Sequence, residues 1–201
     1  MSIIEIKDLH KVYDGKSLPV YAVNGIDIKI EAGEFTAVVG PSGSGKTTLL
    51  NIVGGLDEPT EGEVFIDGVK ITGLSGKEKT DFRMKNIGFV FQAYNLIPVF
   101  TAKENVEFIL HLQGKPKAER ERRTKELLEA VGLGDRMDSR PNKLSGGQQQ
   151  RVAVARALAS KPKFILADEP TANLDSKSTD NLLEIMEKLN REENITFLFS
   201  T

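Results

Sequence analysis

The sequence predicts an α/β fold with a parallel-sheet core, an antiparallel β layer and an inserted helical subdomain. Residues 35–39 form a short apolar run rich in β-forming residues, which is typical of a buried parallel strand. Asp67-Gly68 lies between two short β-rich runs and indicates a hairpin, so an antiparallel layer should accompany the core. Residues 101–159 follow a mostly helical pattern.

Strands are predicted on both sides of the helical segment. The first eight residues are β-prone and carry charges, which favours a strand over a signal peptide. Residues 26–30 alternate isoleucine with polar residues, as a half-buried strand does. Residues 87–91 and 164–167 are apolar and predict two further buried strands.

A single domain is expected over residues 1–201, because this length suffices for one sizeable core. We expect the core to comprise residues 1–92 and 161–201, and the helical subdomain to comprise about 93–160.

Glycines and a proline divide the helical segment. Gly114-Lys115-Pro116 breaks the pattern once, and Gly132 with Gly134 breaks it again. After the first break, Glu119 is spaced to pair with Arg123 along one helix. Charges of both signs alternate there, which predicts a solvated helix face.

Composition limits the classes of function. Hydrophobic residues make up 39% of the chain and charged residues 28%, as is usual for globular domains. The net charge of −2 argues against direct nucleic-acid binding, and the lack of cysteine excludes disulfides and thiolate metal sites. No apolar run approaches the roughly 20 residues that span a bilayer, so work at a membrane would require a partner.

A glycine-rich loop separates the strand at 35–39 from a helical pattern. It reads Gly40-Pro41-Ser42-Gly43-Ser44-Gly45-Lys46-Thr47, with Thr48 directly behind it. Its glycines allow backbone N–H groups to point inward, and the helix N-terminus adds a positive dipole end. We expect Lys46 to reach the β- and γ-phosphates of a nucleotide and the Thr47 hydroxyl to ligate Mg²⁺. A chance glycine-serine turn is the alternative, and the flanking strand and helix argue against it.

Two carboxylates end the apolar run at residues 164–167. Mg²⁺ prefers oxygen ligands and keeps several waters, so one carboxylate near the phosphates suffices, and Asp168 fits that role. Glu169 lies one residue further, where it could orient or deprotonate an attacking water. Read alone, the pair could be an acidic turn after a core strand.

A second glycine-rich site, Leu144-Ser145-Gly146-Gly147-Gln148, opens another predicted helix. Ser145 is a natural N-cap, and the two glycines allow a ligand to approach the backbone closely. A plain capped helix is an equally good interpretation of this segment by itself.

Taken in order, these motifs resemble the nucleotide-binding subunit of ATP-binding-cassette (ABC) transporters. The order is the phosphate loop, Gln92 after an apolar strand, the Leu-Ser-Gly-Gly-Gln signature, and Asp168-Glu169. The resemblance covers essentially the whole chain. It implies that residues 40–47 form the Walker A loop.

The resemblance also implies roles for single residues. Tyr13 would stack on adenine, and Gln92 would contact Mg²⁺ or the attacking water beside the transmembrane partner. Asp168 would be the Walker B aspartate and Glu169 the catalytic glutamate. ATP and Mg²⁺ are the implied cofactors.

Two anion-binding helix starts in one chain fit the family's dimer. In that arrangement Ser145, Gly146, Gly147 and Gln148 would close over ATP held by the loop of a second subunit. The implied assembly is a homodimer with ATP between its subunits, bound to a transmembrane permease on the cytoplasmic face of the cell membrane. The sequence alone leaves a single intrachain site open as the alternative.

Within the family, residues 51–57, 91–106 and 144–151 are similar to the lipoprotein-release and macrolide-export branch. The resemblance therefore implies an ATP-hydrolysing subunit that powers export or lipoprotein release through its permease. The alternative is an ABC-type ATPase of a non-transport system such as cell division or DNA repair. A nucleotide-binding regulatory module without hydrolysis is a third reading, which Glu169 argues against.

The chain stops in a β-rich apolar run at residues 194–201. In the family, a switch-loop histidine follows such a strand, so we expect the C-terminal part of the domain to be missing. We also expect the last strand to leave an exposed apolar edge that pairs with other chains.

Overall fold

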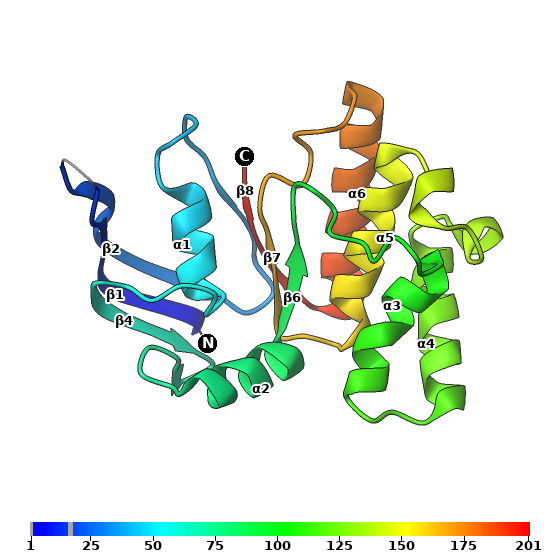
Figure 1. Cartoon of the computed structure of the whole chain (residues 1–201), viewed down its shortest axis with the longest axis horizontal. Coiled ribbons are helices and arrows are strands. Elements are labelled where there is room, and N and C mark those ends of the chain that lie inside the picture. The colour runs from blue at the N-terminus through cyan, green and yellow to red at the C-terminus, as the bar shows by residue number, and fades with distance from the viewer. Residues whose placement is uncertain (1, 16–17) are drawn as a thin grey trace.

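Figure 1 shows the computed structural model, which describes residues 2–15 and 18–201. The strands are β1 (Ser2–Tyr13), β2 (Val20–Glu31), β3 (Phe35–Val38), β4 (Glu61–Ile66), β5 (Val69–Lys70), β6 (Ile87–Val90), β7 (Phe164–Ala167) and β8 (Thr196–Ser200). The helices are α1 (Lys46–Val53), α2 (Gly76–Asn86), α3 (Ala102–Leu112), α4 (Lys117–Ala130), α5 (Gly146–Ala159) and α6 (Ser176–Glu193). Short 3-10 helices cover Gly134–Arg136 and Pro141–Lys143. Over the described ranges, no helix has both the length and the apolar character needed to cross a membrane.

The antiparallel layer is present, with the strand order β2-β1-β4-β5. The predicted hairpin is confirmed, because β4 and β5 pair antiparallel with Phe65 opposite Lys70. Its turn residues, Asp67 and Gly68, have φ values of 48° and 75°, as tight hairpin turns require. In β2, Ile30 is buried and residues 26 and 28 are half-buried, so the predicted half-buried strand is confirmed.

The parallel sheet has the order β3-β8-β7-β6. The last strand, β8, pairs with β3 on one side and with β7 on the other. The expected exposed edge at the chain's end is therefore wrong: this strand lies inside the sheet, and β3 and β6 are its outer strands. The carboxyl ends of all four strands meet at one edge, where ligands bind in open α/β sheets.

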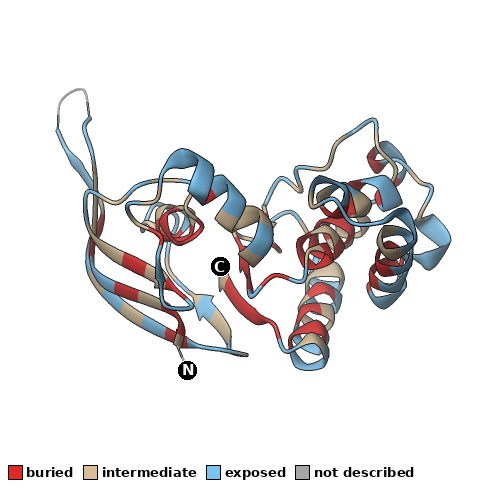
Figure 2. Ribbon diagram, turned by 90° about the horizontal axis from the view of Figure 1, so that it is seen from below, coloured by how far each residue is buried: buried red, intermediate tan, exposed pale blue. Residues whose placement is uncertain are grey.

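Side chains alternate between two hydrophobic clusters on the two faces of the parallel sheet. Phe164 and Leu166 of β7 pack with α1 and the antiparallel sheet. Ile165 and Ala167 pack with helices α3, α4, α5 and α6. Figure 1 shows α1 between the two sheets and helices α3, α4, α5 and α6 beyond the parallel sheet. Figure 2 shows that the buried residues of the strands and helices face the interior. The helical segment thus shares its hydrophobic cluster with the core sheet, and the proposed domain boundaries stay a prediction.

Charge pairing on α4 differs from the sequence prediction. Glu119 pairs with Lys115 at 3.1 Å, not with Arg123. Arg123 is only 8% exposed and donates to both carboxylate oxygens of Glu193 at 2.9 and 3.1 Å. Such a bidentate pair engages both terminal nitrogens of a guanidinium that has little access to water, and here it ties α4 to the end of α6.

Candidate functional site

The glycine-rich loop joins β3 to α1 at the carboxyl edge of the parallel sheet (Figure 1). Gly43 and Gly45 have φ values of 82° and 93°, in the left-handed region that glycine adopts readily. A Cβ at Gly45 would lie 2.0 Å from the carbonyl oxygen of Ala22, so only glycine fits there. Gly45 is the N-cap of α1 and provides no side-chain cap, so the helix presents its first N–H groups to the space in front of the loop.

Lys46 is buried at the centre of this loop. Its Nζ donates to the carbonyl oxygens of Gly40 at 2.7 Å and Pro41 at 3.2 Å. The same ammonium lies 3.8 Å from Oε1 of Glu169. The Lys46 ammonium therefore links the phosphate loop to Glu169, one of the two carboxylates that follow β7.

Asp168 and Glu169 leave the end of β7 beside the loop. The N–H of Asp168 donates to the carbonyl oxygen of Val90 at 2.9 Å, which holds this end of β7 against β6. The Thr47 hydroxyl donates to Oδ1 of Asp168 at 3.0 Å, across a sequence separation of 121 residues. Glu169 has a φ of 43°, a left-handed conformation that costs free energy for a residue with a Cβ.

A cavity of about 560 Å³, the nucleotide cavity below, lies in front of the loop and gathers most of the predicted residues. The predicted residues that line it are Tyr13, Ser42, Gly43, Gly45, Lys46, Thr47, Thr48, Gln92 and Glu169. Gly40, Pro41 and Ser44 belong to the same loop outside the lining, and Asp168 adjoins the cavity through its hydrogen bond from Thr47.

Tyr13 is held by two side chains that sequence reasoning missed. Its hydroxyl donates to Oδ2 of Asp57 at 2.6 Å. Lys11 donates to Oδ1 of the same carboxylate at 2.8 Å and lies 4.7 Å from the centroid of the Tyr13 ring. Burial raises the pKa of Tyr13, and the hydrogen bond to Asp57 adds to the rise. The network fixes the ring with a cation over one face, which suits stacking of a base on the other.

Gln92 is exposed and lines the nucleotide cavity from the end of β6. Its carbonyl oxygen accepts a hydrogen bond from Nδ2 of Asn173 at 2.9 Å. This contact ties the loop after β6, which carries Gln92, to the segment that follows Glu169.

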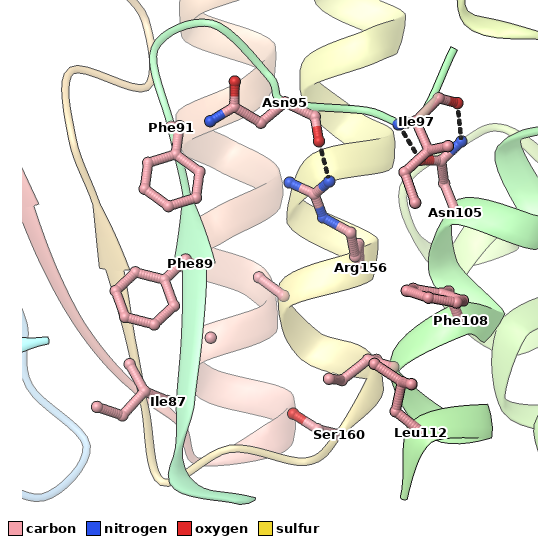
Figure 3. A pocket seen from close by; sticks show the side chains of 13 residues that line it. Ile87, Phe89, Phe91, Asn95, Ile97, Asn105, Phe108, Leu112, Arg156 and Ser160 are labelled. Atoms are coloured by element: carbon pink, nitrogen blue, oxygen red, sulfur yellow. Dashed lines mark hydrogen bonds between the residues drawn. The ribbon is translucent and has the colours of Figure 1, made fainter. Parts of the chain in front are cut away.

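Figure 3 shows how the loop after Gln92 is anchored to α3 and α5. Arg156 donates to the carbonyl oxygens of Asn95 and of Tyr94, the latter at 2.9 Å. Asn105, which is 1% exposed, accepts from the N–H of residue 97 at 2.8 Å. Burial lowers the pKa of the Arg156 guanidinium. Because Tyr94 and Asn95 both have positive φ, these bonds hold a backbone that most residues avoid.

An apolar hollow of about 370 Å³ lies under this loop, between β6, α3 and α5 (Figure 3). Its apolar side chains include Ile87, Phe89, Phe91, Phe108 and Leu112. Phe108 and Leu112 are 38% and 54% exposed, so the hollow opens to the surface.

The second glycine-rich site caps α5. Ser145 is the N-cap: its Oγ accepts the N–H of Gln148 at 3.3 Å, while Oε1 of Gln148 accepts the N–H of Ser145 at 2.9 Å. A Cβ on Gly146 would lie 2.8 Å from the Tyr94 hydroxyl, so a larger residue at this position would require the Tyr94 side chain to shift. Ser145, Gly146, Gly147 and Gln148 do not line the nucleotide cavity. The capping interpretation is confirmed, and the ligand-binding one stays a prediction.

Ser200 is a site residue that sequence reasoning missed. It is fully buried at the end of β8, and its hydroxyl donates to Oδ1 of Asp168 at 2.8 Å. Oγ of Ser200 also accepts the N–H of Glu169 at 2.9 Å. In the sequence, Ser200 is only a polar residue at the end of an apolar run. This pattern points to the site only once β8 is known to lie beside β7.

The oxygen atoms around the loop suit a hard cation. A hydroxyl from Thr47, a carboxylate from Asp168 and an amide from Gln92 converge here, and Mg²⁺ is commonly bound by one or two protein oxygens together with phosphate and water. The described residues contain no cluster of three or more His, Cys, Asp or Glu side chains suited to a metal. A cation held mainly by its nucleotide fits this arrangement.

Comparisons with known proteins agree with the geometry. A sequence profile of the family described as "ABC transporter" matches residues 23–172. An uncharacterized ABC transporter ATP-binding protein of Thermotoga maritima is 53% identical over 187 residues, which cover 93% of this chain and 80% of that protein. The macrolide export ATP-binding/permease protein MacB of Brucella melitensis is 48% identical over 94% of this chain, which spans 29% of MacB.

A solved structure has the same architecture. It is the dimeric post-hydrolysis state of the ATP-binding cassette MJ0796, bound to ADP and Pi, and it covers 98% of this chain and 87% of its own. The TM-score is 0.90 at 46% sequence identity. The phosphate loop, the carboxylates after β7 and the capped α5 thus occur in a fold shared with that cassette. This chain belongs to the ABC transporter family, as an ATP-binding and ATP-hydrolysing cassette.

Proposed function

We propose that the nucleotide cavity binds Mg-ATP and that Glu169 drives its hydrolysis. The observation that carries this proposal is the hydrogen bond from Thr47 to Asp168, with Lys46 and Glu169 in the same cavity. Nucleotide calorimetry together with a phosphate-release assay on the full-length protein tests it. Binding of ADP and Pi by the MJ0796 cassette supports the same assignment.

The main residues in and beside the cavity have separate proposed tasks. Lys46 and the uncapped N–H groups of α1 bind the β- and γ-phosphates, and Tyr13 stacks on adenine. Thr47, Asp168 and Gln92 hold Mg²⁺, which supplies charge neutralisation on the phosphates. Glu169 orients the attacking water and accepts its proton.

We infer that two copies of this chain sandwich ATP, and the dimeric state of the MJ0796 cassette supports this. Ser145, Gly146, Gly147 and Gln148 lie outside the cavity of their own chain, so they are available to the nucleotide of a partner. The exposed Ser145 and the N-terminus of α5 provide the anion-binding groups for that contact.

We expect Ser145→Arg to block ATP-dependent dimerisation while the monomer still binds ATP, because the bulky cation would occupy the space of the partner's nucleotide. Size-exclusion chromatography with ATP, in a Glu169→Gln background, measures the dimer. Loss of Ser145 also removes a helix cap, so Ser75→Arg is the matched control: Ser75 forms the same capping box at α2. Dimerisation by Ser145→Arg, or loss of ATP binding by its monomer, would contradict the proposed sandwich.

A permease is the proposed membrane partner, and the apolar hollow under the Gln92 loop is the proposed contact. The hollow lies between that loop and α3. Arg156 and Asn105, which hold the loop by hydrogen bonds, line the hollow. A partner bound in the hollow would therefore shift the loop and Gln92 with it. Phe108 is exposed beside Leu112, and aromatic side chains and exposed apolar patches are typical of protein interfaces.

We expect Leu112→Asp to weaken co-purification with the permease and to leave ATP affinity unchanged, because the charge would be buried at the contact. Val69→Asp on β5 is the matched control, since Val69 is 43% exposed and Leu112 is 54% exposed. If both variants co-purify equally well with the permease, the apolar hollow is not the contact.

The proposed location is the cytoplasmic face of the cell membrane, with the cassette held by its permease. The likeness to MacB, together with residues 51–57, 91–106 and 144–151, supports an export or lipoprotein-release system over cell division or DNA repair. Movement of substrate in sealed vesicles that contain cassette and permease tests the direction of transport.

A further inference from the structure

The end of β8 carries a hydroxyl in contact with both carboxylate residues of the nucleotide cavity. Ser200 is 0% exposed and lies opposite Val38 of β3 in the sheet register. On its other side it donates to Oδ1 of Asp168 and accepts the N–H of Glu169, at 2.8 and 2.9 Å. The hydroxyl therefore bridges the two residues from the interior of the sheet.

The geometry points to Ser200 as a positioning residue that orients Glu169 and Asp168 for hydrolysis, an inference that rests on the proposed roles of these two carboxylates. Glu169 has a φ of 43°, which needs compensating contacts because it is unfavourable for any residue with a Cβ. The hydrogen bond from its N–H to Ser200 is one such contact. It fixes the backbone from which the Glu169 side chain reaches the cavity.

The same hydroxyl sets the orientation of Asp168. Oδ1 of Asp168 accepts two hydrogen bonds, from Thr47 at 3.0 Å and from Ser200 at 2.8 Å. Two donors on one oxygen fix the rotation of the carboxylate, and groups that orient a metal ligand affect metal affinity and activity. Ser200 thus acts on both carboxylates although it does not line the nucleotide cavity.

A purely structural role for a buried hydroxyl is the competing explanation, and β8 contains a matched example. Thr196, at the start of the same strand, is 1% exposed and accepts the N–H of Gly33 at 2.8 Å. Both hydroxyls accept one backbone N–H, but of the two only Ser200 also donates to the carboxylate of Asp168. Comparison of variants at Ser200 and Thr196 therefore separates an effect on the orientation of the carboxylates from an effect on the stability of the fold.

The experiment compares Ser200→Ala, Ser200→Thr and Thr196→Val in the full-length protein. We expect Ser200→Ala to lower kcat by about 10- to 100-fold, the range found when groups that orient metal ligands are removed. ATP affinity measured by calorimetry should stay unchanged, and the half-saturating Mg²⁺ concentration should rise. Thr196→Val should lower the Tm and retain kcat, and Ser200→Thr should recover turnover because it restores the hydroxyl.

A second arm separates this inference from the proposed function. If Ser200 acts in part through Glu169, Ser200→Ala lowers kcat by a smaller factor in the Glu169→Gln background than in the wild-type protein. If Glu169→Gln itself turns over normally, the proposed function fails. If Glu169→Gln is inactive while Ser200→Ala keeps wild-type kcat, only the positioning role is overturned. Ser200→Cys keeps the shape of the side chain, with a slightly larger atom that is a weaker donor and acceptor, and it replaces Ser200→Ala if that variant does not fold. Wild-type kcat in Ser200→Cys would also overturn the inference.

Discussion

Glu169→Gln is expected to lower ATP turnover by about 10²- to 10⁴-fold, the usual contribution of a positioned general base. Its side chain lines the nucleotide cavity, and its Oε1 lies 3.8 Å from the Lys46 ammonium. An amide of nearly the same shape cannot accept a proton from water. ATP binding should be retained or strengthened, because a negative charge beside the phosphates is removed.

Phosphate release measures the turnover of Glu169→Gln, and size-exclusion chromatography detects the ATP-bound dimer that should accumulate. Glu193→Gln is the matched control, since the two side chains are similarly exposed, at 33% for Glu169 and 29% for Glu193. Glu193 pairs with Arg123, outside the cavity, so this variant should retain turnover. Hydrolysis by Glu169→Gln at the wild-type rate would rule out the proposed base.

Lys46→Ala is expected to abolish tight ATP binding. The substitution removes a buried cation at the centre of the loop, and charge-assisted hydrogen bonds of this kind contribute about 1.5–3 kcal/mol each. It also leaves the carbonyl oxygens of Gly40 and Pro41 without the donor that holds them. Loop conformation and phosphate binding should therefore weaken together.

Calorimetry with ATP measures this loss. Lys79→Ala is a matched control, because Lys79 and Lys46 are each 8% exposed and Lys79 pairs with Glu58 outside the lining of the cavity. ATP affinity should persist in Lys79→Ala. An unchanged affinity in Lys46→Ala would show that residues 40–47 do not bind the phosphates.

Local sequence determined the elements of this chain. Apolar runs marked β3, β6 and β7, and Asp67-Gly68 marked the hairpin of β4 and β5, because each signal depends on residues next to one another in the chain. The phosphate loop was readable for the same reason: its glycines and Lys46 act within eight consecutive residues. The ABC motifs, in their order, were sufficient to identify the family.

The order of strands in the sheet was decided only by tertiary structure. An apolar run at residues 194–201 has the same local pattern whether it becomes an edge strand or an inner strand. Long-range pairing with β3 and β7 placed β8 inside the sheet. Arg123 is a similar case, since its spacing to Glu119 suggested a surface pair and its burial against α6 selected Glu193.

The sequence by itself therefore determined the family, the phosphate loop and the carboxylates as separate motifs. Only the tertiary structure showed that Ser200 adjoins Asp168 and Glu169, and that Lys11 and Asp57 hold Tyr13. These contacts join residues from different strands and loops, and no periodicity or spacing encodes them. They are set by which strands pair and by the need of buried polar groups for hydrogen-bond partners, both of which depend on the whole fold.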